Sequence, residues 1–207
     1  AARIILELDP DARFWVRCNA SPPKAWRDKY PDQMLLNFYG KRYEEPSLAS
    51  DRFCEGVGLF IENLVRFCER QPWADRLAGY MIYPIGEGTT PLTCDGHLFD
   101  QSPAMQEGFR AFLARKYGTD AALRAAWSRD DVTLATVAVP NDEAFYARGK
   151  TDFARVTRDG LRVERIPHRL HWPESEEIAD ARDYCEYMRE LTERNFRTLL
   201  SAVKRVA

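Results

Sequence analysis

The stretch that decides the fold is Leu77-Ala78-Gly79-Tyr80-Met81-Ile82-Tyr83-Pro84-Ile85-Gly86-Glu87-Gly88. Its first seven residues are a short, continuous apolar run, which is typical of a strand covered by helices on both sides. The run ends at a proline, and Glu87 follows between two glycines. A carboxylate in a turn at the end of a buried strand is where α/β enzymes place catalytic groups. The stretch therefore predicts an α/β enzyme with chemistry at Glu87.

The residues upstream complete a strand, helix, strand unit. Arg13 to Cys18 is a candidate strand, and Ser47 or Ser50 can cap a helix that ends near Gln71-Pro72. The apolar positions of this helix recur at helical spacing, and they are Phe53, Val57, Phe60, Ile61, Leu64 and Cys68. Because two strands joined by a helix pair in parallel, the segment predicts a parallel crossover unit. Residues 1–8 are expected to be the end of an earlier helix.

Two further helices are predicted downstream. Ser102 is a typical N-cap with Pro103 at the first helical position, and Gly118 is a favoured left-handed residue for the helix end. One face of this helix carries Met105, Phe109, Phe112 and Leu113. Thr119 and Asp120 then cap a short helix that ends at Trp127.

The other segments are less regular. Residues 19–50 are rich in proline and aromatic side chains, which favours a long, packed, functional loop. Residues 131–173 are expected to form a loop or an excursion on the surface. Residues 174–207 predict a long amphipathic helix. Its expected apolar face consists of Ile178, Tyr184, Cys185, Met188, Leu191, Phe196, Leu199, Leu200 and Val203.

Composition excludes several classes of protein. The 207 residues include 45% hydrophobic side chains, as a globular core requires, and 30 basic against 32 acidic residues give a net charge of −2. This balance gives no reason to expect nucleic acid or a membrane surface as a partner. Five widely spaced cysteines indicate buried thiols rather than disulfides or a zinc site. Neither a signal peptide nor an apolar run of about 20 residues is found, which slightly favours the cytoplasm.

Several motifs resemble family 42 glycoside hydrolases and related β-galactosidase-like enzymes. The resemblance covers about two thirds of the chain. It rests on Pro22-Pro23-x-x-Trp26, Pro46-Ser47-Leu48-Ala49-Ser50, a strand ending in a glutamate, Phe99-Asp100-Gln101-Ser102-Pro103, and Phe109-Arg110-x-Phe112-Leu113-x-x-Lys116-Tyr117-Gly118-Thr119-x-x-Ala122-Leu123-x-x-Ala126-Trp127. The resemblance implies an α/β fold in which the chain is a fragment of a (β/α)8 TIM barrel. Residues 13–18 would be the third strand and residues 77–83 the fourth.

The resemblance also implies retaining glycoside hydrolysis with Glu87 as the general acid/base. Such enzymes use a second carboxylate as the nucleophile, with the two carboxyl groups about 5–5.5 Å apart. The nucleophile is expected beyond Ala207, so the isolated segment is expected to be inactive. Related enzymes usually carry an asparagine just before the acid/base, whereas this chain has Gly86. The alternative for Glu87 is that it is a solvated glutamate in a turn, without a catalytic role.

Four other residues are predicted to contact a carbohydrate substrate. Arg17 and Asn19 leave the third strand at its ligand-binding end, with loop pinning as the alternative. Trp26 is a candidate for stacking on a sugar ring, with a role as a loop anchor as the alternative. His97 is placed to line the sugar site, whereas Asp100 is interpreted as a support for the turn before Ser102. No metal and no cofactor are expected.

Residues 1–207 are interpreted as one partial catalytic domain with an irregular excursion at about residues 128–175. Related enzymes are often trimers, so a homo-oligomer is a possible assembly. Unpaired strand edges and apolar helix faces predict poor solubility for the segment alone. Two other functions stay open: a carbohydrate-binding relative that has lost catalysis, in which Gly86 marks the loss, and an α/β scaffold or interaction domain.

Overall fold

The computed structural model describes residues 2–83, 99–148 and 178–206. The chain divides into two compact units. Unit 1 comprises Ala1–Pro23, Asp51–Thr90 and Glu193–Ala207, and unit 2 comprises Lys24–Ser50 and Pro91–Thr192. Glu87, His97 and most of the predicted excursion lie outside the described residues.

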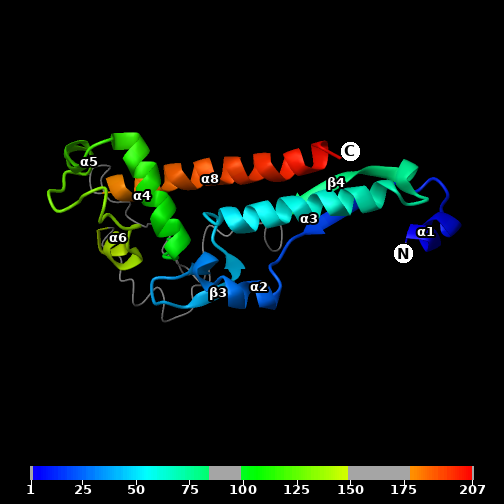
Figure 1. The fold of residues 1–207 in the computed structure, drawn as a ribbon, viewed down its shortest axis with the longest axis horizontal. Helices are drawn as coiled ribbons and strands as arrows, with labels where there is room; N and C mark the ends of the chain where they lie inside the picture. The colour runs from blue at the N-terminus through cyan, green and yellow to red at the C-terminus, as the bar shows by residue number, and fades with distance from the viewer. Residues whose placement is uncertain (1, 84–98, 149–177, 207) are drawn as a thin grey trace. The chain divides into compact units, whose positions relative to one another are not determined.

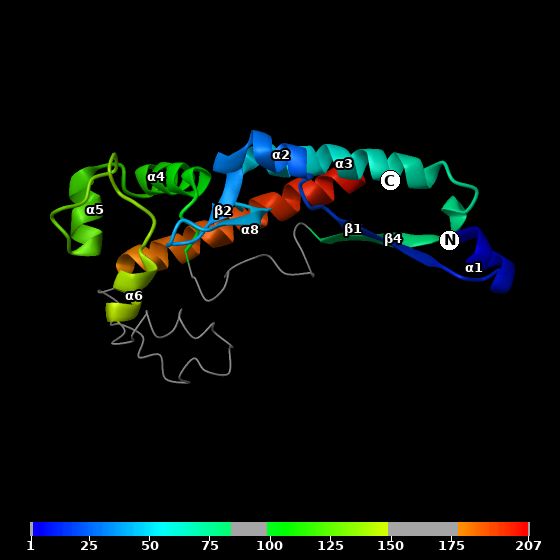
Figure 2. The same ribbon diagram turned by 90° about the horizontal axis from the view of Figure 1, so that it is seen from below.

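Unit 1 contains the parallel crossover that the sequence predicts. Strand β1 (Phe14–Asn19) pairs in parallel with β4 (Leu77–Tyr83), and helix α3 (Asp51–Glu69) lies between them in the sequence. Figure 2 shows the two strands side by side. A short helix α1 (Ala2–Leu8) precedes β1, and the 3-10 turn η2 (Ala74–Arg76) leads into β4. These elements confirm the expected α/β fold class.

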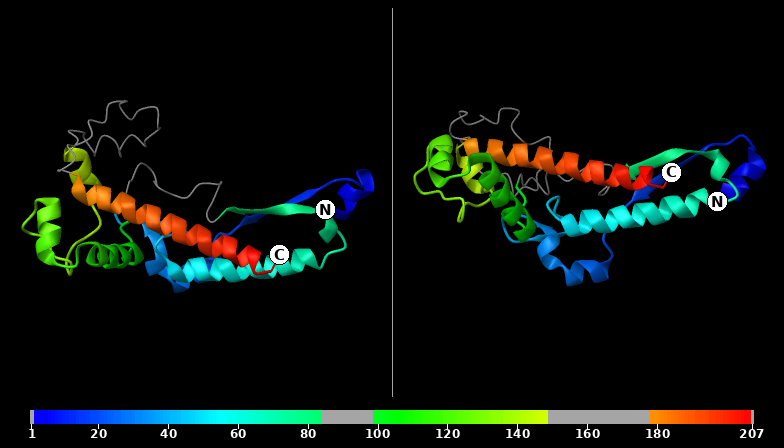
Figure 3. Two further views of the ribbon diagram at one scale, coloured as in Figure 1. Left: turned by 90° about the horizontal axis from the view of Figure 1, so that it is seen from above. Right: turned by 45° about the horizontal axis from the view of Figure 1, so that its top comes forward.

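The core of unit 1 lies between α3 and the end of the long helix α8 (Ala179–Lys204). Figure 3 shows the last turns of α8 running alongside α3. Both helices contribute to one cluster of buried residues, which consists of Cys54, Val57, Ile61, Val65, Leu199 and Ala202. Tyr80 and Ile82 of β4 pack against this cluster, so one face of the strand pair is covered by helices.

The opposite face of the strand pair carries exposed side chains. Trp15 is 64% exposed and Met81 is 42% exposed. The register shifts between Phe14 and Trp15, so that Trp15 lies opposite Gly79. A Cβ atom at position 79 would lie 2.7 Å from the Trp15 ring, and this close approach explains the glycine.

Unit 2 begins with the proline-rich segment, which folds into short elements rather than an irregular loop. Helix α2 (Lys24–Lys29) and the turn η1 (Pro31–Gln33) lead into β2 (Met34–Leu36), which pairs antiparallel with β3 (Arg42–Pro46). Met34 and Leu35 are buried. The expectation of a packed segment is therefore confirmed.

Helices α4 and α5 of unit 2 begin and end at the residues that the sequence predicts. Helix α4 (Pro103–Tyr117) begins at Ser102, whose hydroxyl accepts a bond from Met105 N at 3.2 Å, and ends at left-handed Gly118 with φ 72°. Thr119 caps α5 (Asp120–Trp127) in the same way, through Ala122 N. The segment expected to be a loop or an excursion contains a further helix, α6 (Asp142–Arg148), which the sequence did not predict. The first turns of α8 also belong to unit 2. Figure 1 shows α4, α5 and α6.

An aromatic cluster forms the interior of unit 2. The Phe109 ring packs on Phe112, Trp127, Tyr184 and Tyr187, with centroid distances from 5.9 to 6.5 Å. Gly108 lets α8 approach α4 closely, because a Cβ atom there would overlap the Tyr187 hydroxyl. The predicted apolar face of the first of these helices is thus confirmed.

Some predicted apolar positions are wrong. Cys185 is exposed, and Phe196 and Leu200 of α8 are 36% and 49% exposed. Phe60 of α3 is also largely exposed, together with Leu59 and Phe67. Helical spacing identifies a side of a helix, but it does not fix how much of that side a neighbouring element covers.

No helix in the described ranges is long and apolar enough to cross a bilayer. Within the same ranges, no group of three or more His, Cys, Asp or Glu side chains is placed to hold a metal ion.

Candidate active site

The candidate active site lies at the carboxyl ends of β1 and β4. Because the strands are parallel, both carboxyl ends meet at one edge, where Asn19 pairs with Tyr83. The chain continues from Tyr83 towards Glu87, which lies outside the described residues. The described part of the site is therefore the strand edge that precedes the predicted acid/base.

Arg17 and Asn19 occupy alternate positions of β1, opposite Met81 and Tyr83. Arg17 belongs to the strand face that the helices of unit 1 leave uncovered, and it is exposed there. The structure thus brings two of the predicted substrate contacts to one strand end. Their contact with a sugar stays a prediction.

Trp26 belongs to unit 2 rather than to this strand edge. It lies on α2, is half-buried, and packs on Tyr30 with the ring centroids 5.2 Å apart. This contact matches the loop-anchor alternative, and it leaves stacking on a sugar as a prediction. His97 lies outside the described residues.

Cys18 and Asp100 have structural roles, as the sequence indicates. Cys18 is buried in unit 1, and burial raises the pKa of its thiol, which opposes the thiolate that a nucleophile needs. Asp100 is buried in unit 2. Its Oδ1 accepts bonds from Ser102 N at 2.8 Å and Leu36 N at 3.2 Å, so it holds the turn before α4. The pKa of Asp100 is raised, mainly by burial.

Three residues of the helix motif that carries the family resemblance converge on a single buried carboxylate. Asp183 of α8 accepts bonds from Lys116 Nζ at 2.9 Å, Tyr117 OH at 2.7 Å and Trp127 Nε1 at 2.8 Å. Burial, and then the bond to Asp183, raises the pKa of Tyr117 to about 12. The carboxylate therefore joins α4 and α5 to α8. The helix motif has an architectural role in these contacts.

One feature of unit 2 was missed by sequence reasoning. A cavity of about 550 Å³ is lined by residues from Trp127 to Arg148 and by Asp180. The sequence offered one weak signal, the pair Arg129-x-Asp131, whose two side chains bond each other. Asp180 lies far along the sequence from the other lining residues, so no single stretch of sequence indicates the whole cavity.

Comparison with known proteins gives structural matches only. No family model and no curated protein matches the chain. A β-galactosidase from the haloarchaeon Halorubrum lacusprofundi matches at a TM-score of 0.61 and 17% identity, over 99% of this chain and 27% of that one. A β-galactosidase from Marinomonas ef1 matches at a TM-score of 0.55 and 17% identity, over 89% of this chain and 24% of that one.

A third structure is the catalytic domain of a β-amylase from Paenibacillus polymyxa. It matches at a TM-score of 0.58 and 13% identity, over 100% of this chain and 50% of that one. The chain thus spans about a quarter of the length of the β-galactosidases that it resembles. At these identities the likeness concerns the fold alone. The chain has an α/β fold that corresponds to part of a (β/α)8 TIM barrel.

Proposed function

We propose that this chain contributes the acid/base side of the active site to a retaining glycosidase of family 42 or a related β-galactosidase-like family. The observation that carries the proposal is the parallel register of β1 and β4, which aligns Asn19 with Tyr83 just upstream of Glu87. In barrel enzymes the catalytic groups follow the carboxyl ends of the strands. The barrel-glycosidase fold supports the same assignment.

In the proposed reaction, Glu87 first protonates the oxygen of the leaving group while a second carboxylate attacks the anomeric carbon. Glu87 then takes a proton from the water that hydrolyses the glycosyl-enzyme. Arg17 and Asn19 are proposed to hydrogen-bond the sugar hydroxyls. We place the nucleophile outside these 207 residues, and the substrate is proposed to be a β-galactoside.

The test compares two aryl β-galactosides in the parent protein. Glu87→Gln is expected to lower hydrolysis of a substrate with a poor leaving group by about 10²–10⁴-fold, because general acid catalysis contributes that much. A dinitrophenyl leaving group needs no proton, so its bond cleavage is expected to be far less affected. Added azide, which needs no base, is expected to restore turnover and to give a β-galactosyl azide.

Glu107→Gln is the matched control, because Glu107 is an exposed carboxylate on α4. It is expected to leave both rates unchanged. Equal losses for both leaving groups, with no rescue by azide, would contradict the acid/base role. Hydrolysis by the 207-residue chain alone that disappears in Glu87→Gln would overturn the placement of the nucleophile.

The same assays distinguish a β-galactosidase from a glycosidase of another specificity and from a carbohydrate-binding relative that has lost catalysis. An α-glucan substrate is included, since one similar structure is that of a β-amylase. Binding of glycans without hydrolysis of either substrate by the parent protein would favour the non-catalytic relative, in which Gly86 marks lost chemistry.

A further inference from the structure

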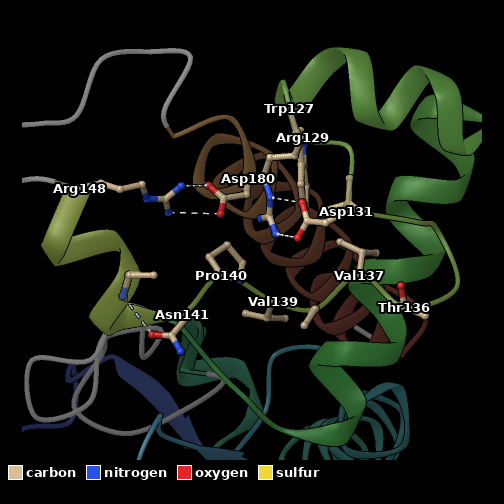
Figure 4. A pocket seen from close by; sticks show the side chains of 13 residues that line it. Trp127, Arg129, Asp131, Thr136, Val137, Val139, Pro140, Asn141, Arg148 and Asp180 are labelled. Carbon is tan, nitrogen blue, oxygen red and sulfur yellow. Dashed lines mark hydrogen bonds and ion pairs between the residues drawn. The ribbon is translucent and has the colours of Figure 1, made fainter.

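The cavity of unit 2 has one charged wall. Arg148 bonds both carboxylate oxygens of Asp180, at 2.9 and 3.2 Å, and Arg129 bonds both oxygens of Asp131, at 3.1 and 2.8 Å. Figure 4 shows the two ion pairs next to each other on one side of the cavity. The hydrogen bonds that Arg129 donates to Asp131 are the main cause of the raised pKa of Arg129, and the charge of Asp180 also contributes. The four groups form a row of alternating charge.

The charged wall has no net charge, because two guanidinium groups are paired with two carboxylates. An anionic ligand would have to compete with Asp131 and Asp180 for the guanidinium groups, and a cationic ligand would have to compete with the arginines for the carboxylates. A neutral ligand avoids both costs. It can use the hydrogen-bonding positions that a bidentate pair leaves over, because a guanidinium has five N–H donors and a carboxylate about four acceptor sites.

The rest of the lining is mostly apolar, with Thr136 and Asn141 as its polar members, and part of it is held in place. Val137, Val139 and Pro140 line the cavity below the ion pairs in the view of Figure 4. Three bonds of 2.8 Å tie these residues to the region of α4. Arg110 Nε donates to Val137 O, Val139 N donates to Gln106 Oε1, and Gln101 Nε2 donates to Pro140 O. The apolar wall is therefore formed in advance of any ligand.

We propose that this cavity binds a neutral mono- or disaccharide. A pyranose ring has apolar C–H faces and a rim of hydroxyl groups that donate and accept hydrogen bonds. It fits a cavity with Val139 and Pro140 on one side and a neutral row of Arg and Asp on the other. The volume of about 550 Å³ lies within the usual range of ligand sites, about 300–1,000 Å³. Trp127, Val137 and Val139 line the cavity although each is only 4% exposed, so none of them offers a broad stacking surface.

The proposed sugar site is independent of the proposed catalysis. All its lining residues belong to unit 2, and none is among the residues predicted for hydrolysis. It does not require Glu87 to be an acid/base, so each proposal can fail alone.

The test titrates the parent protein, carrying isotope-labelled valine, with methyl β-galactoside, methyl α-glucoside, lactose or maltose and follows the amide signals by NMR. At least one of these neutral sugars is expected to shift the signals of Val137 and Val139 in a saturable way. Galacturonate is expected to bind at least tenfold more weakly, because its carboxylate would have to compete with Asp131 and Asp180 for the guanidinium groups. No saturable shift with any of the sugars, or galacturonate binding as tightly as the neutral sugars, overturns the proposal.

Two variants fill the cavity without breaking an ion pair. Ala138→Trp in the loop and Ala144→Trp on α6 are each expected to weaken binding at least tenfold. The control is Ala135→Trp, an exposed alanine of the same loop that does not line the cavity. Arg17→Ala in unit 1 is expected to leave the binding unchanged. Binding that survives both filling variants, or that is lost in Arg17→Ala, overturns the proposal.

Discussion

Asp100 is a carboxylate held in the interior of unit 2. It is 6% exposed, its Oδ1 accepts two backbone N–H bonds, and its own N–H donates to the Tyr184 hydroxyl at 3.0 Å. Burial raises the pKa of the Asp100 carboxyl, although the hydrogen bonds act in the other direction. Asp100 therefore supports a turn, and its buried carboxyl makes the free energy of unfolding depend on pH.

The sign of this pH dependence follows from the raised pKa. Below the ordinary value of 3.8, both the folded and the unfolded states bind the proton, and the contribution of Asp100 to stability is fully present. As the pH rises through the folded pKa, that contribution is lost by about 1.4 kcal/mol for each pKa unit of the shift. Asp100→Asn keeps an oxygen acceptor but does not titrate. In urea unfolding, the free energy of unfolding of the variant is expected to rise relative to that of the wild type between pH 4 and 7. The size of this rise is expected to be on the order of 1.4 kcal/mol for each pKa unit of the shift.

Asp32→Asn is the control for this experiment, because Asp32 is an exposed carboxylate of the same unit. Its effect on the free energy of unfolding is expected to stay within about 0.5 kcal/mol at every pH. Parallel pH curves for Asp100→Asn and wild type would show that the buried carboxyl does not govern this pH dependence.

The sequence could predict the role of Asp100 because that role is local. A carboxylate that bonds the backbone two residues ahead is a recognisable turn pattern. Asp183 is the opposite case. Its donors lie 67, 66 and 56 positions away in the chain, so no window of sequence contains the interaction. The acid/base role of Glu87 is equally non-local and stays a proposal.

At the scale of elements, the ends of helices were predictable and their faces only partly so. Ser102, Gly118 and Thr119 act through the first or last turn of their own helix, which the sequence contains. The face of a helix depends on neighbours elsewhere in the chain. Phe60, Phe196 and Leu200 fit the helical period and are nevertheless exposed.

Asp183 is expected to be the strongest single link between the helices of unit 2. Asp183→Ala would leave Tyr117 and Trp127 without their acceptor at a site that is 1% exposed, whereas Lys116 keeps its bond to Glu186. Leaving buried donors without an acceptor costs about 1–3 kcal/mol. The free energy of unfolding, measured by urea titration, is expected to fall by this amount.

Glu190→Ala is the matched control, because Arg115 and Glu190 form an exposed ion pair between the same two helices, α4 and α8. Its removal is expected to cost less than about 1 kcal/mol. A similar loss for Asp183→Ala and Glu190→Ala would show that burial does not strengthen the link at Asp183.

At the scale of the whole molecule, the fold class was predictable because two apolar strands and the helix between them are all present in one stretch of sequence. The chain spans about a quarter of the β-galactosidases that share its fold. Because the nucleophile is proposed to lie outside these residues, the sequence could predict only the acid/base side of the proposed site.

The exposed apolar side chains make a further whole-molecule prediction. Leu59 and Phe67 of α3 are 63% and 59% exposed, and each of the paired strands β1 and β4 has one edge without a partner among the described strands. Expressed alone, the 207-residue chain is expected to bind a hydrophobic dye and to associate. The double variant Leu59→Lys and Phe67→Lys is expected to lower dye binding and to raise the soluble fraction at least twofold.

Ile61→Lys is the control, because Ile61 is fully buried in the core of unit 1. It is expected to lower the soluble fraction. If the double variant behaves like Ile61→Lys, or if the unmodified chain stays monomeric and unfolds in one cooperative transition, the exposed side chains are not the cause of association.

The contacts of Asp183 have a consequence for how such sequences diverge. Lys116, Tyr117 and Trp127 are tied to helix packing and not to the strand edge where catalysis is proposed. Mutation that abolishes hydrolysis leaves the selective pressure on these four residues intact, because the protein must still fold. A descendant that has lost its enzymatic role would therefore keep the helix motif. The motif indicates a shared fold, whereas the residues after β4 indicate whether a given descendant is still an enzyme.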